Sequence, residues 1–259
     1  MDSTVAITGA HGFLGSAIRS TLDAEHHVTS LGRHPGDEPW QLSDNLPPDL
    51  DGTLALIHCA WAVAPRTSAV ANMNIAGSLS LLDEARRHGI PFVFISSMSA
   101  SDTTRSRYGR AKRAVERHVL TYEKGIVVRP GTIRDEAGGL GMLGASLGRL
   151  ASLPVDAQID PDPLVPLVSL ERVVEESLKP VVAPADTPRE IVLVDEWTPL
   201  SRLIASLAPD GTTKRVIRLP QALITTASTV AQYASVPPFR DLADSWLGLI
   251  DAAHAHRTD

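Results

Sequence analysis

Short apolar runs alternate with segments of helical apolar spacing along the first half of this chain. The runs have the length and composition of buried strands, and they occupy residues 5–7, 27–31, 54–60, 92–95 and 125–131. Between them, apolar residues recur at helical spacing over residues 16–22, 74–88 and 108–119. Strands and helices that alternate in this way predict an α/β fold with a doubly wound parallel sheet.

The pattern loosens after residue 133. Residues 134–166 are rich in Gly, Leu, Pro and Asp, and residues 35–53, which hold one brief strand candidate at 40–42, are similarly irregular. Ser169 is placed to cap a helix that Pro180 is expected to end. Later elements are a strand at 191–194 and helices at 200–207 and 221–233, with fraying expected from Ala252 onward.

Composition narrows the class of protein. The 259 residues are 43% hydrophobic and 21% charged, which is globular, and the net charge of −6 argues against a nucleic-acid partner. Cys59 is the only cysteine, so no internal disulfide can form, and no signal peptide is recognisable. The longest uncharged stretch, 219–239, contains prolines and many polar residues and is interpreted as globular. We therefore expect a cytoplasmic protein without a membrane partner, and we single out no metal site.

A glycine-rich turn follows the first apolar run and precedes the first helix. Such a strand, glycine turn and helix is the context of a dinucleotide-binding loop in a Rossmann-type sheet. Gly9 permits the tight turn, Gly12 lets the backbone approach a pyrophosphate, and Gly15 lets helix and strand pack closely. The helix N-terminus then offers free N–H groups to the phosphates. The alternative is a purely structural turn.

The end of the second strand bears on the choice of cofactor. NAD-specific sites usually place an acidic residue there to bond the ribose hydroxyls, and this chain continues Gly32-Arg33-His34 instead. Arg33 could meet a 2′-phosphate through charge-assisted hydrogen bonds, which favours NADP over NAD. The alternative is that Arg33 is a solvated surface charge.

Three residues point to proton chemistry at the carboxyl edge of the sheet. Ser97 follows the strand at 92–95, where ligands of open parallel sheets bind. Tyr108 and Lys112 are four residues apart and so share one helix face. A nearby ammonium group would favour the phenolate and lower the pKa of Tyr108 towards neutrality. His58, at the end of another strand, is interpreted as structural rather than as a catalytic base.

With these elements in place, the chain resembles the extended short-chain dehydrogenase/reductase superfamily, and within it the NAD(P)-dependent sugar epimerase/dehydratase branch. The similarity covers residues 4 to about 135 well and the rest loosely. The matching segments are TGAHGFLG at 8–15, IHCA at 57–60, NIAGS at 74–78, FVFISS at 92–97, YGRAK at 108–112 and RPGTI at 129–133.

The resemblance implies a role for each matching residue. Ser97 would polarise the substrate oxygen, Tyr108 would be the general acid/base, and Lys112 would bond the nicotinamide ribose. Asn74 would support the active-site helix. The residues implied at the cofactor are Gly9, His11, Gly12, Phe13, Leu14, Gly15, Arg33, Leu42, Cys59, Ala60, Asn74 and Pro130.

The chain also departs from the pattern of the sugar-modifying enzymes. Gln41 stands where an aspartate is usual beside the adenine, Asp135 replaces a common glycine, and Glu171 stands near a usual aspartate. Met98 and Ser99 occupy the positions where sugar dehydratases carry an Asp-Glu pair, so dehydration is disfavoured.

The sequence therefore predicts an NAD(P)-dependent oxidoreductase or epimerase acting on a nucleotide sugar or another small carbonyl or hydroxyl compound. The alternative is a non-catalytic NADP-binding sensor or scaffold on the same fold. We expect residues 1–259 to form one NAD(P)-binding chain, with 134–166 and 190–259 contributing most of the substrate-binding part. A homodimer through the helices at 74–88 and 108–122 is a further expectation.

Overall fold

Parallel strands form the central sheet of the computed structural model, which describes residues 4–24, 26–44, 46–64, 66–152, 155–207, 215–233 and 237–255. The strands are β1 (Thr4–Thr8), β2 (His27–Gly32), β3 (Glu38–Pro39), β4 (Thr53–His58), β5 (Phe92–Ile95), β6 (Gly125–Pro130) and β10 (Glu190–Leu193). Within the described residues, these seven strands lie in the order β10-β6-β5-β4-β1-β2-β3. All of these strands are parallel; β2 and β3 are added on one side of β1, and β4 and the later strands on the other, as in a Rossmann-type doubly wound sheet, so the predicted fold class is confirmed.

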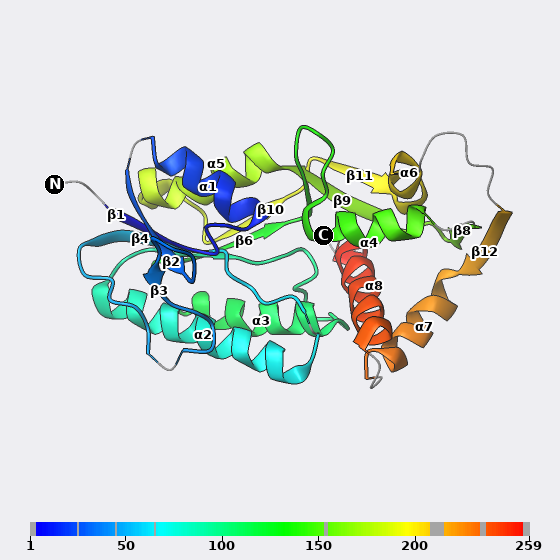
Figure 1. The fold of residues 1–259 in the computed structure, drawn as a ribbon, viewed down its shortest axis with the longest axis horizontal. Helices are drawn as coiled ribbons and strands as arrows, with labels where there is room; N and C mark the ends of the chain where they lie inside the picture. Colours follow the sequence, from blue (N-terminus) through cyan, green and yellow to red (C-terminus); the bar gives the residue numbers. More distant parts are fainter. Residues whose placement is uncertain are drawn as a thin grey trace.

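Helices cover both faces of this sheet, as Figure 1 shows. Helices α1 (Phe13–Leu22) and α5 (Leu170–Val182) lie on one face, and α2 (Ser68–His88) and α3 (Arg107–Val119) lie on the other. Alternate strand residues enter the two cores: Val5 and Ile7 pack towards α1, whereas Ala6 packs towards α2 and α3. Burial on both faces explains why the strands are continuous apolar runs in the sequence.

A second part of the molecule gathers at one end of the sheet (Figure 1). Strands β7 (Thr132–Arg134), β9 (Leu164–Ser169) and β11 (Glu196–Pro199) form a small sheet, and β8 (Val155–Asp160) pairs with β12 (Arg215–Pro220). The helices of this part are α4 (Gly141–Ala151), α6 (Leu200–Ser206), α7 (Gln221–Ala231) and α8 (Pro237–Ala255), and a 3-10 turn, η1 (Pro184–Asp186), follows α5.

The structure corrects several predicted boundaries. The short strand before Trp40 is β3 at residues 38–39, whereas the prediction was 40–42. Helix α2 begins six residues earlier than predicted, because the Thr67 hydroxyl accepts the Val70 N–H at 3.2 Å and caps it. Helix α5 continues past Pro180, which lies in its last turn.

The prediction for the carboxyl-terminal end is also corrected. Residues 252–255 were expected to fray, but they belong to α8, and residues 256–259 lie outside the described part. Helix α7 ends at Ala231, two residues before the predicted end. In the part of the chain that the structure describes, no helix combines the length and the apolar character needed to cross a bilayer.

Candidate active site

A cavity of about 400 Å³ opens at the carboxyl ends of the central strands. The residues that follow β1, β4 and β5, and Pro130 at the end of β6, form one side of it, and helix α8 and the small sheet around β9 form another. It lies where ligands of doubly wound sheets bind. Of the predicted site, the lining includes Gly9, Gly12, Phe13, Leu14, Gly15, Cys59, Ser97, Tyr108, Lys112 and Pro130.

The glycine loop has the geometry that its sequence predicted. Gly9 has a φ of +69°, and a Cβ there would lie 2.8 Å from the backbone nitrogen of Ala60. A Cβ on Gly15 would lie 2.1 Å from the carbonyl oxygen of Gly9, so the helix can approach the loop only with glycine at this position. Gly12 is the N-cap of α1 and offers no side chain to the first turn, and the first-turn residues Phe13, Leu14 and Gly15 line the cavity. These residues fit a dinucleotide pyrophosphate.

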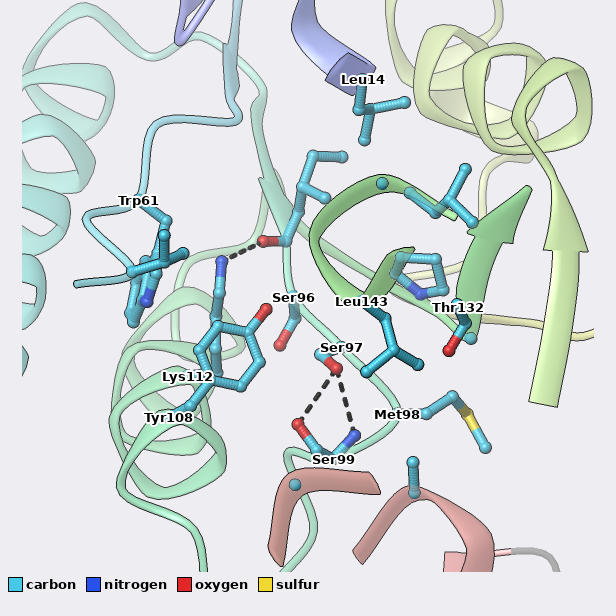
Figure 2. Close-up of a pocket in the computed structure, with 18 of the residues that line it drawn as sticks. Leu14, Trp61, Ser96, Ser97, Met98, Ser99, Tyr108, Lys112, Thr132 and Leu143 are labelled. Atoms are coloured by element: carbon cyan, nitrogen blue, oxygen red, sulfur yellow. Dashed lines mark hydrogen bonds between the residues drawn. The ribbon is translucent and has the colours of Figure 1, made fainter. Parts of the chain in front are cut away.

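Ser97, Tyr108 and Lys112 meet at this cavity (Figure 2). Tyr108 and Lys112 project from the first turns of α3, and Ser97 follows β5. The Ser106 hydroxyl caps α3 by accepting the Gly109 N–H at 3.0 Å. A Cβ on Gly109 would lie 2.4 Å from the carbonyl oxygen of Ser99, so glycine allows the helix to press against the loop that follows Ser97. The local sequence therefore sets the distance between the serine and the tyrosine.

The Lys112 ammonium group lies in an aromatic and largely dry environment. Its side chain is buried, and Nζ donates a hydrogen bond of 2.6 Å to the carbonyl oxygen of Ile95. Nζ also lies 3.9 Å from the ring centre of Trp61 and 4.7 Å from that of Phe94. Burial lowers the pKa of Lys112 to about 7, although Cys59 and Glu116 act in the opposite direction.

The predicted lowering of the Tyr108 pKa is wrong for this structure. Burial raises the pKa of Tyr108, and Arg66 and the Ser97 hydroxyl oppose that shift without overcoming it. The physical reason is that burial removes the phenolate from water, and this penalty on the charged form exceeds the help that Arg66 and Ser97 give it.

The three serines that follow β5, Ser96, Ser97 and Ser99, differ in their hydrogen bonds. The hydroxyls of Ser97 and Ser99 lie 3.0 Å apart, and the Ser99 N–H donates to Ser97 Oγ at 3.2 Å (Figure 2). The Ser96 hydroxyl is buried in the cavity wall and has no hydrogen-bond partner among the described groups. An orphaned buried hydroxyl at the wall is a group that a bound cofactor or substrate can satisfy.

Two carboxylates from α8 hold the start of α3, and the sequence analysis did not single them out. Asp244 is fully buried and accepts the Arg107 N–H at 2.6 Å, the Tyr108 N–H at 3.4 Å and Arg66 Nη1 at 3.1 Å. Asp251 accepts the N–H groups of the two residues before α3 at 2.9 and 3.0 Å. The two aspartates are seven residues apart and therefore share one helix face, which was a readable signal.

His58 is a structural residue, as the sequence analysis interpreted it. It is fully buried, with Nδ1 2.6 Å from the Thr8 hydroxyl and Nε2 2.8 Å from the Ser78 hydroxyl. The Ser78 hydroxyl donates its own proton to the Asn74 carbonyl, so Nε2 carries the histidine proton. Burial lowers the pKa of His58 to about 3, so the ring is neutral and bridges β1, β4 and α2.

The remaining predicted cofactor residues lie outside this cavity. Asn74 is buried and exchanges two hydrogen bonds, of 2.9 and 2.8 Å, with the backbone of Ala62, so it supports the loop after β4. The backbone of Leu42 packs against Gly77 of α2, and the Ala60 N–H donates to the Thr8 hydroxyl at 3.1 Å.

A turn after β2 brings Asp37 back beside the end of that strand, where the sequence analysis placed no acidic residue. His11 Nε2 lies 2.9 Å from the carboxylate of Asp37, which also accepts the His34 N–H at 3.0 Å and lies against Gly32. Burial disfavours the Asp37 carboxylate, but its hydrogen bonds to His11 and His34 outweigh this effect and lower its pKa. Arg33 is exposed beside this cluster.

The fold, the glycine loop and the hydroxyl and amine groups at the cavity define a dinucleotide-dependent enzyme of the Rossmann type. A model of the NAD dependent epimerase/dehydratase family matches residues 5–134. A ceramide reductase of Caulobacter vibrioides is 30% identical over 255 residues, covering 87% of this chain and 76% of that relative. The chain therefore belongs to the NAD dependent epimerase/dehydratase family and is an NAD(P)-dependent oxidoreductase or epimerase.

Solved structures agree on the fold. A nucleoside-diphosphate-sugar epimerase of Staphylococcus aureus superimposes with a TM-score of 0.67 at 14% identity, covering 96% of this chain and 91% of the other. The RMD protein of Pseudomonas aeruginosa, solved with NADPH, gives a TM-score of 0.57 at 18% identity, covering 83% of this chain and 87% of the other. The family match supports an enzyme and not the alternative of a non-catalytic NADP-binding sensor or scaffold.

Proposed function

We propose that this protein is an NADPH-dependent reductase that converts the ketone of a largely apolar substrate into an alcohol. The observation that supports this proposal is the lining of the cavity. Around Ser97, Tyr108 and Lys112, the described wall is mostly apolar, and its members include Trp61, Val63, Met98, Leu140, Leu143, Val165 and Leu249. The similarity to a ceramide reductase, named for an apolar substrate, favours the same class.

The charges at the cavity support an apolar ketone better than a nucleotide sugar. A nucleoside diphosphate needs cations or oriented N–H groups beyond those that bind the cofactor. Among the described lining residues, the cationic side chains are Arg66 and Lys112. Arg66 already forms an ion pair of 3.1 Å with the buried Asp244, and Lys112 lies against the Trp61 ring.

In the proposed reaction, Ser97 donates a hydrogen bond to the substrate carbonyl oxygen and so favours negative charge on it. The cofactor supplies the hydride that the carbonyl carbon accepts. The Tyr108 hydroxyl donates its proton to the same oxygen, which completes the alcohol. Lys112, when protonated, stabilises the phenolate that remains, and the raised pKa of Tyr108 keeps the phenol protonated before transfer.

The preference for NADPH is assigned to Arg33. This side chain is exposed at the end of β2, where the 2′-phosphate of the adenosine ribose is bound in such folds. The neighbouring Asp37 carboxylate is already engaged by His11 and the His34 N–H. Calorimetry at fixed salt should show NADPH binding more tightly than NADH, with the difference lost in Arg33→Ala. Arg87→Ala, an exposed arginine on α2, is the control. Equal binding of both cofactors to the wild type would contradict the assignment.

The reaction is tested by NADPH oxidation with long-chain aliphatic ketones and with 4-keto nucleotide sugars. We expect turnover of the aliphatic ketones, a loss of at least a hundredfold in kcat for Tyr108→Phe, and no loss for Tyr233→Phe, whose side chain is 66% exposed. Full turnover by Tyr108→Phe would refute the mechanism. Turnover restricted to the nucleotide sugars would refute the substrate class.

The cavity wall also supports the prediction that the carboxyl-terminal segments form most of the substrate-binding part. Its substrate side includes Leu140, Val165, Ser245 and Leu249, which belong to segments 134–166 and 190–259. A homodimer and a cytoplasmic location stay predictions from the sequence. Sedimentation as a monomer at micromolar concentration would remove the first of them.

A further inference from the structure

Helix α7 has the reverse of the usual orientation for a surface helix. Its inward face is polar: Thr225, Ser228 and the following Gln232 are 9%, 8% and 1% exposed. Its outward face is apolar, with Leu223 and Val230 63% and 72% exposed. A helix of a soluble protein normally buries its apolar stripe and exposes its polar one. The apolar stripe of α7 is therefore turned towards something other than this chain's own core.

The polar inward face is held in place by specific hydrogen bonds. Trp246 of α8 donates from Nε1 to the Thr225 hydroxyl at 3.3 Å, and Arg110 of α3 donates to the Gln232 side-chain oxygen at 3.3 Å. The guanidinium of Arg107 also donates to the Gln232 carbonyl. Rotation of α7 to hide Leu223 and Val230 would break these bonds. The orientation of the helix is thus stabilised by its neighbours.

The outward face of α7 has no charged side chains and few free hydrogen-bonding groups for water among its described residues. The sequence carries no Asp, Glu, Lys, Arg or His between Leu219 and Phe239. The hydroxyls of Thr226 and Thr229 are satisfied inside the helix, each donating at 2.8 Å to the carbonyl four residues earlier. Such internal bonding of threonine hydroxyls lowers the polarity of a helix surface. The outward face of α7 therefore suits an apolar environment.

Cations flank this face at both ends. Arg218, in the strand before α7, is exposed. At the other end, the guanidinium of Arg107 lies 4.7 Å from the ring centre of Tyr233, whose side chain is 66% exposed. Arg110, on an exposed position of α3, lies beside the same end of the helix. An exposed aromatic residue and arginines around an apolar stripe match the boundary of a bilayer with anionic headgroups.

We propose that the outward face of α7, formed by Leu223, Val230 and Tyr233, binds the surface of a phospholipid bilayer that contains anionic lipids. With 11 residues, α7 is about 16 Å long, which is too short to span the hydrocarbon core but sufficient to lie in the interface. Figure 1 shows α7 at the same end of the molecule as β12, with α8 between it and α3. The sequence alone predicted no membrane partner, and the exposed side chains change that expectation.

The test is flotation of the full-length protein with vesicles of pure phosphatidylcholine and of phosphatidylcholine mixed with phosphatidylglycerol. We expect the wild type to float with the mixed vesicles, and less so at high salt, because the arginine contribution is screened. Leu223→Glu/Val230→Glu should lower the partition coefficient at least tenfold, since two apolar side chains no longer enter the interface. Val182→Glu, an apolar residue of α5 that is 61% exposed, is the matched control and should float like the wild type.

Thermal melts verify that the variants fold. A second double variant without added charge, Leu223→Ser/Val230→Ser, should also bind the mixed vesicles less than the wild type does. Binding is measured without cofactor or substrate, so its result is independent of the proposed reaction. A wild type that remains unbound with all vesicles would overturn the proposal. So would a wild-type dimer in sedimentation that the double variant converts to monomer without any flotation, because the stripe would then bind a second copy.

Discussion

Lys112 provides the sharpest quantitative test of the site, because its environment couples folding stability to pH. Burial lowers its pKa from 10.5 to about 7 in the folded protein. The unfolded chain therefore holds this proton more tightly than the folded one, so unfolding is favoured at low pH and stability rises as pH increases from about 7 to about 10.5. Lys112→Met removes the titration while keeping a side chain of similar length.

The magnitude follows from the shift. Each unit of pKa difference between the folded and unfolded states corresponds to about 1.4 kcal/mol. Between pH 6 and pH 9 the folded protein loses the Lys112 proton while the unfolded chain keeps it, over about two pH units. The free energy of unfolding of the wild type should therefore rise by about 3 kcal/mol relative to Lys112→Met over this interval. At pH 6, where the charge is buried, the variant should be the more stable protein.

Urea unfolding of the cofactor-free protein at pH 6, 7, 8 and 9 measures this difference directly. Other groups that titrate in this range are common to both proteins and cancel in the comparison. Lys124→Met is the control, because Lys124 is exposed and should leave the pH dependence of the wild type unchanged. A difference between wild type and Lys112→Met that stays constant from pH 6 to pH 9 would refute the buried, partly neutral amine.

Three further predictions concern the surroundings of the site. Asp244→Asn should lower the free energy of unfolding in urea by about 2–4 kcal/mol, because the Arg66 guanidinium and the N–H groups that Asp244 binds lose a buried negative charge. Asp83→Asn, at a side chain that is 67% exposed, should change it by less than about 0.5 kcal/mol. Equal effects of the two substitutions would contradict the role of α8. Gly15→Ala should reduce NADPH affinity at least tenfold by calorimetry, since its Cβ would overlap the Gly9 carbonyl, whereas Gly148→Ala, with open space around it, should bind normally. Cys59 should react with a disulfide reagent at pH 8 much more slowly in the folded than in the unfolded protein, because burial raises the pKa of its thiol to about 12, and equal rates would argue against that environment.

The central sheet and the joint place of Tyr108 and Lys112 at one cavity could be predicted because their signals are local. The strands carry continuous apolar runs since both of their faces are buried, and the glycine loop is readable from the spacing of Gly9, Gly12 and Gly15. Tyr108 and Lys112 can be recognised as a pair because four residues, about one helical turn, separate them. In each case a few neighbouring residues determine the outcome, so no knowledge of distant contacts was needed.

The missed features depend on residues far apart in the chain. The pKa of Lys112 is lowered by burial, and the rings of Trp61 and Phe94 beside its amine meet it only across the folded sheet edge. Asp37 reaches the end of β2 by a tight turn whose geometry the sequence does not reveal. Helix α8 is an exception, because its buried residues Ala243, Leu247, Ile250 and Ala253 follow helical spacing and could have been recognised.

The two carboxylates of α8 restrict how this protein can be re-engineered. In many enzymes a new substrate preference is obtained by exchanging the carboxyl-terminal segment between relatives. Here that segment also supplies the acceptors for the first N–H groups of the helix that carries Tyr108, through Asp244 and Asp251. A graft that lacked acids at both positions would alter recognition and proton transfer together. Substrate range and turnover in this chain are therefore expected to change jointly, and chimaeras should be designed with both aspartates retained.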